Sequence, residues 1–256
     1  MPTERRPSDH PAAVFHDTQC AEDYDADRFG GAFGRYLEER EVRLFQELVG
    51  ADARTILDAG AGTGKLSIQF LRDGRHVVSA DFSQAMARVA REKMSLEGLR
   101  PRFAISDVQR LCFRTASFDC AVCSRVLMHV DDWRAGVGEL CRVTRGAVVL
   151  DFPPRFSAAG VDALRKRLFR GRFGAYRQPY RTLPVGAVIR EFAAHGFRVV
   201  DRRATFDLPL AWHRRLDRPG FSQWIEGMLS RLGLSRWLGA PATFKAVRLG
   251  ITPGKG

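Results

Sequence analysis

Apolar residues in the middle of the chain alternate between short β-like runs and longer segments with helical spacing. The short runs predict strands at 55–57, 76–80, 103–105, 120–123 and 147–150. Helical spacing fills the gaps between them at 65–72, 83–96 and 132–143. Because strands separated by helices pair in parallel through crossover connections, this order predicts an open α/β sheet with helices on both faces.

The two ends of the chain are less regular. Residues 1 to about 22 are expected to be loosely ordered, whereas apolar side chains at helical spacing predict a helix from about Gly34 to Val49. Beyond Asp151 we expect five further elements: helices at about 159–170, 185–194 and 221–238, and strands at 197–204 and 243–249. The last strand should return antiparallel beside the strand at 197–204, which completes a Rossmann-like sheet of seven strands.

The composition is that of an ordinary soluble globular protein. The chain has 256 residues, of which 45% are apolar and 27% charged. Uninterrupted apolar stretches such as Gly146 to Leu150 are far shorter than the ~20 residues that cross a bilayer. The segment from Met1 to Pro11 is charged and proline-rich where a signal peptide would need an apolar core. We therefore expect a cytoplasmic protein.

The net charge of +12 is unevenly distributed. Residues 1–150 carry a net charge of −1 and residues 151–256 a net charge of +13. This asymmetry suggests an acidic partner for the carboxyl-terminal part, such as nucleic acid, anionic lipid or a phosphorylated substrate. Arginine outnumbers lysine by 36 to 5, so a general compositional bias is an alternative explanation.

The five cysteines are predicted to be free thiols, because their number is odd and the chain shows no export signal. Cys120 and Cys123 form a CxxC pair, a spacing that can hold zinc. They lie, however, in an apolar run that predicts a buried strand with side chains on alternate faces, and no further ligands follow at suitable spacing. We expect small buried side chains and no metal.

The most informative stretch runs from Ile56 to Leu66 and reads Ile-Leu-Asp-Ala-Gly-Ala-Gly-Thr-Gly-Lys-Leu. A strand ends at Asp58, a turn carries three glycines at positions 60, 62 and 64, and a helix follows. This arrangement lets a ligand approach the backbone at the carboxyl edge of an α/β sheet.

Two nucleotide motifs are excluded by this spacing. A P-loop would need glycine and Ser or Thr where Ala59 and Leu66 stand. A dinucleotide fingerprint would need its third Gly or Ala where Lys65 stands, one position after Gly64. The remaining interpretation is a GxGxG loop preceded by an acidic residue.

Three later signals agree with that interpretation. Asp81 ends the second strand, 21 residues after Gly60, where a carboxylate can accept both hydroxyl hydrogens of a ribose. Asp107 follows the third strand, and the fourth strand with its loop spans Phe118 to Asp132. With these features, residues from about 24 to 152 resemble the class I S-adenosylmethionine-dependent methyltransferases, particularly the small-molecule group related to quinone-biosynthesis enzymes.

The resemblance implies S-adenosyl-L-methionine as the cofactor. Its implied binding residues are Tyr24, Asp58, Gly60, Gly62, Gly64, Asp81, Phe82, Asp107, Val108 and Ser124. Asp81 would bind the ribose and Asp107 the adenine amino group, while Asp58 could instead order the loop backbone. The resemblance also implies an amino-terminal segment, 1–33, that covers the cofactor, and a methyltransferase domain, 34–256, with basic helical elements on the acceptor side within 155–240.

His129 is the candidate catalytic residue. The sulfonium already makes the methyl group electrophilic, so the enzyme mainly has to hold a nucleophile in line and exclude water. His129 follows the fourth strand, where the acceptor pocket of the family opens, and could take a proton from a phenol or alcohol. Structural packing at the start of a helix is the alternative role.

The acceptor itself is left open by the sequence. We expect O- or C-methylation of a lipophilic or quinone-like metabolite, and the apolar face of 221–238 could lie at a membrane surface or pack on the sheet edge. The alternatives are an RNA, DNA or protein methyltransferase that uses the basic half, and a non-catalytic partner of another enzyme. Nucleic acid is disfavoured because no separate nucleic-acid module is evident, and Ser-Arg-Val-Leu at 124–127 replaces the tetrapeptide typical of base methylation.

Overall fold

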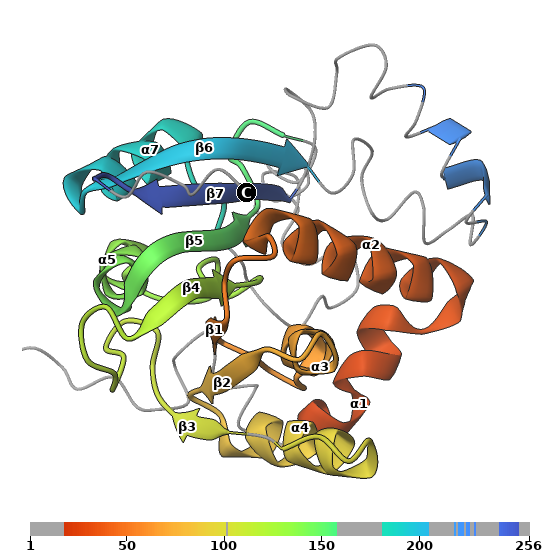
Figure 1. Ribbon diagram of the computed structural model, residues 1–256. Helices are drawn as coiled ribbons and strands as arrows, with labels where there is room; N and C mark the ends of the chain where they lie inside the picture. The colour runs from red at the N-terminus through yellow and green to blue at the C-terminus, as the bar shows by residue number, and fades with distance from the viewer. Residues whose placement is uncertain are drawn as a thin grey trace, which may run out of the picture.

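The computed structural model describes residues 18–100, 102–157, 181–204 and 241–250, together with positions 218, 220–222, 224, 225 and 228. The elements alternate between helices and strands over most of this range (Figure 1). In chain order they are α1 (Thr18–Phe29), α2 (Gly31–Val49), β1 (Thr55–Ala59), α3 (Lys65–Arg72), β2 (His76–Asp81), α4 (Gln84–Leu96), β3 (Phe103–Ile105), β4 (Phe118–Cys123), α5 (Trp133–Val143), β5 (Thr144–Phe152), α7 (Val185–Ala194), β6 (Phe197–Ala204) and β7 (Ala242–Arg248).

The seven strands form one sheet in the order β3-β2-β1-β4-β5-β7-β6. Strands β1 to β5 pair in parallel, whereas β7 runs antiparallel to both β5 and β6. This arrangement confirms the expected mixed sheet, with the last strand antiparallel beside β6. The carboxyl ends of β1, β2 and β4 therefore meet at one edge of the sheet, where α/β proteins bind their ligands.

Helices cover both faces of the sheet (Figure 1). On one face α2 and α3 pack with Phe45 and Phe70 against Ile56 of β1. On the other face, Leu140 of α5 and Phe192 of α7 belong to a second buried cluster. This cluster also contains apolar residues of β1, β4 and β5. Parallel strands have apolar side chains on both faces, so each face needs a layer of helices to cover it.

The amino-terminal expectation needs one correction. Residues 18–22 are the first part of α1 and are not loosely ordered. Tertiary contacts hold this helix in place: Ala21 is buried with Met86 and Val89 of α4, and Glu22 pairs with Arg88 at 2.8 Å.

Two predicted carboxyl-terminal helices lie wholly or partly beyond the described residues. The helix at 159–170 is not described, and only six positions of the 220–228 stretch are assigned as helical. Of these, Phe221, Trp224 and Met228 have exposed side chains, with 45%, 63% and 41% of their surface accessible.

The CxxC pair lies in β4 on opposite faces of the sheet, with Cys120 in one core cluster and Cys123 in the other. Burial raises the pKa of the Cys120 thiol to about 12 and that of Cys123 well above its ordinary value. Both side chains are buried as predicted. Among the residues described, no cluster of His, Cys, Asp and Glu is arranged to hold a metal ion. None of the helices seen in the structure is both long and apolar enough to span a membrane.

Candidate functional site

A cavity lies at the carboxyl edge of the sheet, between α1, the loops after β1 and β4, and the segment after β3. Nine of the residues singled out from the sequence line it: Tyr24, Gly60, Gly62, Asp81, Phe82, Asp107, Val108, Ser124 and His129. The topology thus gathers residues that are up to 105 positions apart in the chain. Asp58 and Gly64 do not line the cavity, so direct binding roles for these two stay predictions.

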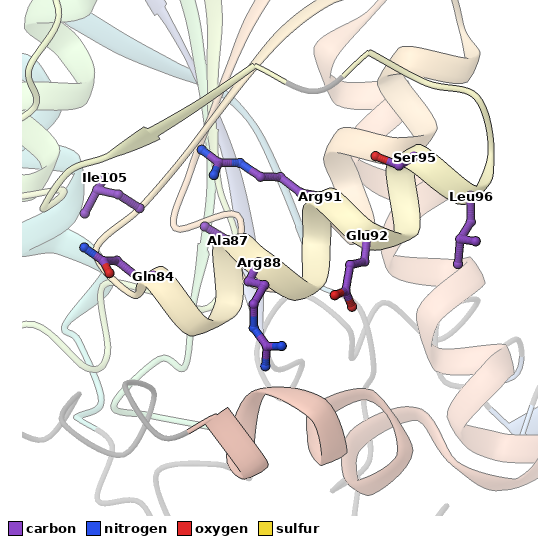
Figure 2. Close-up of a pocket in the computed structure, with 8 residues that line it drawn as sticks. All are labelled: Gln84, Ala87, Arg88, Arg91, Glu92, Ser95, Leu96 and Ile105. Atoms are coloured by element: carbon purple, nitrogen blue, oxygen red, sulfur yellow. The ribbon is translucent and has the colours of Figure 1, made fainter.

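A larger hollow lies on the outer surface of α4, beside the edge strand β3 (Figure 2). It is lined almost entirely by side chains of that one helix, with Ile105 at its border. Its arginines already have neighbours, because Arg88 pairs with Glu22 and Arg91 lies over the Phe103 ring at 5.2 Å. The hollow holds none of the strand-end carboxylates or glycines of the sheet edge, so it is not the candidate site.

The glycine loop after β1 brings backbone close to the cavity. A Cβ atom at Gly60 would lie 2.1 Å from Cγ2 of Val126, so the loop after β4 packs directly on this glycine. A Cβ atom at Gly62 would meet nothing within 4 Å, because this position faces open space. Both residues have positive φ angles, 76° and 54°, which favour glycine.

Asp81 connects this loop to the end of β2. One of its carboxylate oxygens accepts the N–H of Gly62 at 2.8 Å, and the other accepts the N–H of Ser83 at 2.9 Å. Ser83 in turn caps α4, with its hydroxyl oxygen accepting the N–H of Met86 at 3.2 Å. A carboxylate offers about four acceptor positions, which is more than these two backbone N–H groups occupy.

Asp58 lies behind the loop rather than in the cavity. Its carboxylate accepts the hydroxyl of Ser67 at 2.7 Å, and Ser67 also contacts the Ser79 hydroxyl at 2.7 Å. Burial raises the pKa of Asp58 to about 6, and the charge of Asp81 adds to this, while the hydrogen bond from Ser67 opposes it. Since Ser67 belongs to α3, the ordering of the loop backbone by Asp58 stays a prediction.

The segment after β3 forms another part of the cavity lining. Asp107 is exposed there, and its carboxylate accepts the N–H of Gln109 at 2.9 Å. Val108 beside it is buried in the core under α5. Asp81 and Asp107 thus both line the cavity, one at the end of β2 and the other just after the neighbouring strand β3.

The loop after β4 supplies His129 and a residue that the sequence analysis missed. Arg125 lines the cavity with φ at 59°, and its backbone N–H donates to the buried carboxylate of Asp151. Its guanidinium pairs with Glu41, which Lys65 also contacts at 2.6 Å. A single arginine in a loop carries no sequence signal, so only the fold places it here.

His129 is 9% exposed and lines the cavity beside Val126 and Val130. Its loop is fixed from the far side by Arg181, whose N–H donates to the Met128 carbonyl at 2.9 Å. The Arg181 guanidinium also donates to the backbone carbonyl of Asp131 at 2.8 Å. Arg181 therefore holds the loop that carries His129, and His129 lines the cavity.

Helix α1 borders the site. Tyr24 lines the cavity, and the next residue, Asp25, accepts the Thr63 hydroxyl of the glycine loop at 2.7 Å. Asp25 also pairs with Lys93 of α4. Through Asp25, α1 therefore contacts both the glycine loop and α4.

Known proteins with similar sequence and structure agree with this arrangement. Residues 56–146 match the family model described as a methyltransferase domain. The demethylmenaquinone methyltransferase of Thermus thermophilus is 32% identical over 194 residues, which cover 68% of this chain and 88% of the relative. The enzyme of the same name from Deinococcus radiodurans is 30% identical over 187 residues, covering 65% and 77% respectively.

A solved structure shows the shared fold. The magnesium protoporphyrin IX methyltransferase ChlM of Synechocystis PCC 6803, determined with bound SAH, superposes with a TM-score of 0.62 at 18% identity. The superposition covers 92% of this chain and 96% of that one. With its glycine loop, its two strand-end aspartates and these relatives, the chain belongs to the class I S-adenosylmethionine-dependent methyltransferases that act on small molecules.

Proposed function

We propose that this enzyme methylates a lipophilic, quinone-like small molecule that enters beside His129. The observation that carries the proposal is the single cavity in which the glycine loop, Asp81 and Asp107 meet His129. The relatives named as demethylmenaquinone methyltransferases support the quinone-like class of acceptor, because one of them matches over most of its length.

The cavity fits S-adenosylmethionine in its residue types. The open space beside Gly62 would admit the methionine part, and Asp81 could accept hydrogen bonds from the ribose hydroxyls. Asp107 is available for the adenine amino group. Phe82 and Val108 offer apolar contact, and Ser124 also lines the cavity. When bound, this cofactor supplies a methyl group made electrophilic by the sulfonium.

The protein would mainly orient the acceptor and exclude water. Tyr24 of α1 covers one side of the cavity, while Val126 and Val130 border it with apolar surface. His129 on the same loop could accept the proton of a phenol at its ring nitrogen as the new bond to the methyl carbon forms. For a carbon acceptor it would remove the proton from the methylated ring carbon.

The acceptor side is anchored next to His129. The N–H of Arg155 donates to the Leu183 carbonyl at 2.9 Å, and Arg181 holds the Met128 carbonyl. The described ends of the segment between Ser157 and Arg181 therefore both lie near the loop that carries His129. This supports a role for the basic region 155–240 in acceptor binding.

The sequence segment 221–238 is proposed to touch a membrane surface from which such an acceptor would be taken. Phe221 and Trp224 have exposed rings with centroids 5.9 Å apart, and Met228 follows one helical turn later on the same side. Arg218 is exposed just before them. Exposed aromatic and sulfur-containing side chains beside an arginine are typical of interfacial helices.

The direct test is a methylation assay with quinone precursors of different ring substitution. We expect release of S-adenosylhomocysteine together with a product that is 14 Da heavier, with mass spectrometric fragmentation placing the methyl on oxygen or carbon. A His129→Asn variant should lose most of the rate and retain cofactor affinity, whereas His195→Asn, at an exposed histidine of the same type, should retain both. Turnover with transfer RNA or duplex DNA and with none of the quinone precursors would refute the proposal.

A further inference from the structure

Charged side chains of both signs line the cavity, and they come from different strand ends. Asp81 lines it at the end of β2 and Asp107 just after β3. Arg125 is the only arginine or lysine that lines the cavity within the described part of the chain. A ligand with one anionic group would therefore be bound with that group toward Arg125 and away from the two aspartates.

We propose that Arg125 binds the α-carboxylate of the methionine part of S-adenosylmethionine. This inference rests on the proposed cofactor site and adds the residue that sets the direction in which the cofactor lies. The adenosyl end meets Asp81 and Asp107, so the amino-acid end extends past Gly60 and Gly62 to the loop after β4. An arginine guanidinium is well suited to a carboxylate there, because its planar donors match both oxygens.

The backbone of Arg125 is held in a conformation that serves this role. Its φ of 59° is in the left-handed region, which a side chain other than glycine rarely adopts. The buried Asp151 holds it by accepting its N–H, and the next residue, Val126, packs directly on Gly60. Arg125 is thus fixed at the level of the first loop glycine, where the amino-acid end of the cofactor would pass.

Glu41 pairs with Arg125 but has a second cationic partner in Lys65. The Glu41 side chain is 1% exposed and lies between two cations, Arg125 at one oxygen and Lys65, 2.6 Å away, at the other. A buried carboxylate left without any cation would be costly. Because Lys65 stays in place, Arg125 can turn toward the carboxylate of the cofactor while Glu41 keeps a charged partner.

Two other charged groups near this cluster have partners of their own. Asp25 pairs with Lys93 and accepts the Thr63 hydroxyl. Lys65 also lies over the Phe29 ring at 4.6 Å, which fixes its ammonium beside Glu41 and α1. Of the two cations on Glu41, Arg125 is the one that lines the cavity, so it is the one assigned to the cofactor.

The test compares two ligands that differ in the amino-acid part. S-adenosylhomocysteine carries the carboxylate, whereas 5′-methylthioadenosine has the adenosine and the sulfur without it. Calorimetric titrations of the full chain should show that Arg125→Gln weakens S-adenosylhomocysteine binding by about 10- to 100-fold, the range for a lost charged hydrogen bond. Binding of 5′-methylthioadenosine should change by less than about twofold, because that ligand makes no carboxylate contact.

Two further variants separate binding from folding. Arg125→Lys keeps the charge and should recover part of the lost affinity, and Arg43→Gln, at an exposed arginine of α2, should bind both ligands as the unmodified protein does. Equal weakening of both ligands by Arg125→Gln, or no weakening of S-adenosylhomocysteine, would overturn the assignment while leaving the cofactor site in place. If the unmodified protein bound neither ligand, the cofactor site itself would be wrong, and this assignment with it.

Discussion

The backbone N–H of Gly62 donates a 2.8 Å hydrogen bond to the carboxylate of Asp81 and so joins the loop after β1 to the end of β2. The same carboxylate accepts the N–H of Ser83 at the start of α4. One buried side chain thereby organises two loops that border the cavity. Asp81 would hold the loop in shape before a ligand arrives as well as contact the ligand.

Replacement of Asp81 by Asn should therefore affect both stability and binding. The amide retains one acceptor oxygen but presents N–H groups to one of its two backbone donors, which leaves that donor unpaired. We expect a loss of about 1–3 kcal/mol in the free energy of unfolding and a fall of about tenfold or more in S-adenosylhomocysteine affinity. Urea unfolding and calorimetry measure the two effects, with Asp52→Asn at an exposed site as the control. An unchanged affinity would rule out Asp81 as the ribose ligand.

Alanine at Gly60 should mainly lower folding stability, whereas alanine at Gly62 should mainly lower cofactor affinity. At Gly60 the new Cβ would overlap Val126, 2.1 Å away, so the loop after β4 must move and the thermal midpoint should drop by several degrees. At Gly62 no atom lies within 4 Å, so the fold should lose only about 1 kcal/mol from the left-handed backbone. The methyl group there would project into the space assigned to the cofactor and weaken S-adenosylhomocysteine binding. Equal affinity of Gly62→Ala and the unmodified chain would place the cofactor elsewhere.

The helices and strands that pack on the sheet were readily predicted from the sequence. The bounds of α3, α7, β3 and β6 agree with the hydrophobic spacing, because these elements bury a periodic face. Helix α1 was not predicted from the sequence, since it has almost no amphipathic character and four acidic residues in twelve. Its position depends on contacts such as Asp25 with Thr63, which no local pattern reveals.

The candidate site was predictable to the extent that its residues follow strand ends. Asp81 ends β2 and Asp107 follows β3, and parallel topology brings such positions to one edge. Asp58 is the last residue but one of β1, and its carboxylate accepts the Ser67 hydroxyl of α3 instead of lining the cavity. Arg125 was not predicted as a site residue because its ion pair is with Glu41, 84 positions earlier in the chain.

The elevated pKa of Asp58 should make folding stability depend on pH. Burial raises the pKa from 3.8 to about 6, so the folded state holds the proton more tightly than the unfolded chain. The resulting stabilisation is complete below pH 3.8 and is lost as the pH rises through 6. Relative to Asp58→Asn, the unmodified chain should lose on the order of 3 kcal/mol between pH 4 and pH 7.

Urea unfolding at several pH values checks this dependence. Ser67→Ala offers a second comparison: removal of the hydrogen bond that lowers the pKa should move the transition to higher pH. Parallel pH curves for the unmodified chain and Asp58→Asn would show that Asp58 ionises normally in the folded protein.

Membrane contact through 221–238 should depend on apolar insertion as well as on positive charge. Interfacial helices combine burial of aromatic side chains with attraction of arginines to anionic headgroups. Sedimentation with vesicles containing anionic lipid should therefore pull down the protein, and Trp224→Glu should reduce binding strongly because Trp224 is 63% exposed. Leu96→Glu, at an equally apolar and 89% exposed position on α4, should bind as the unmodified chain does.

Salt distinguishes this mode of binding from simple attraction between charges. A surface that is merely basic would release the vesicles at high ionic strength and would respond equally to Trp224→Glu and Leu96→Glu, since both add one negative charge. Insertion of Trp224 and Phe221 predicts a residual binding to vesicles at high salt that Trp224→Glu alone removes. If the protein stays in the supernatant with anionic and neutral vesicles alike, the exposed side chains do not serve a membrane, and the acceptor must reach His129 from solution.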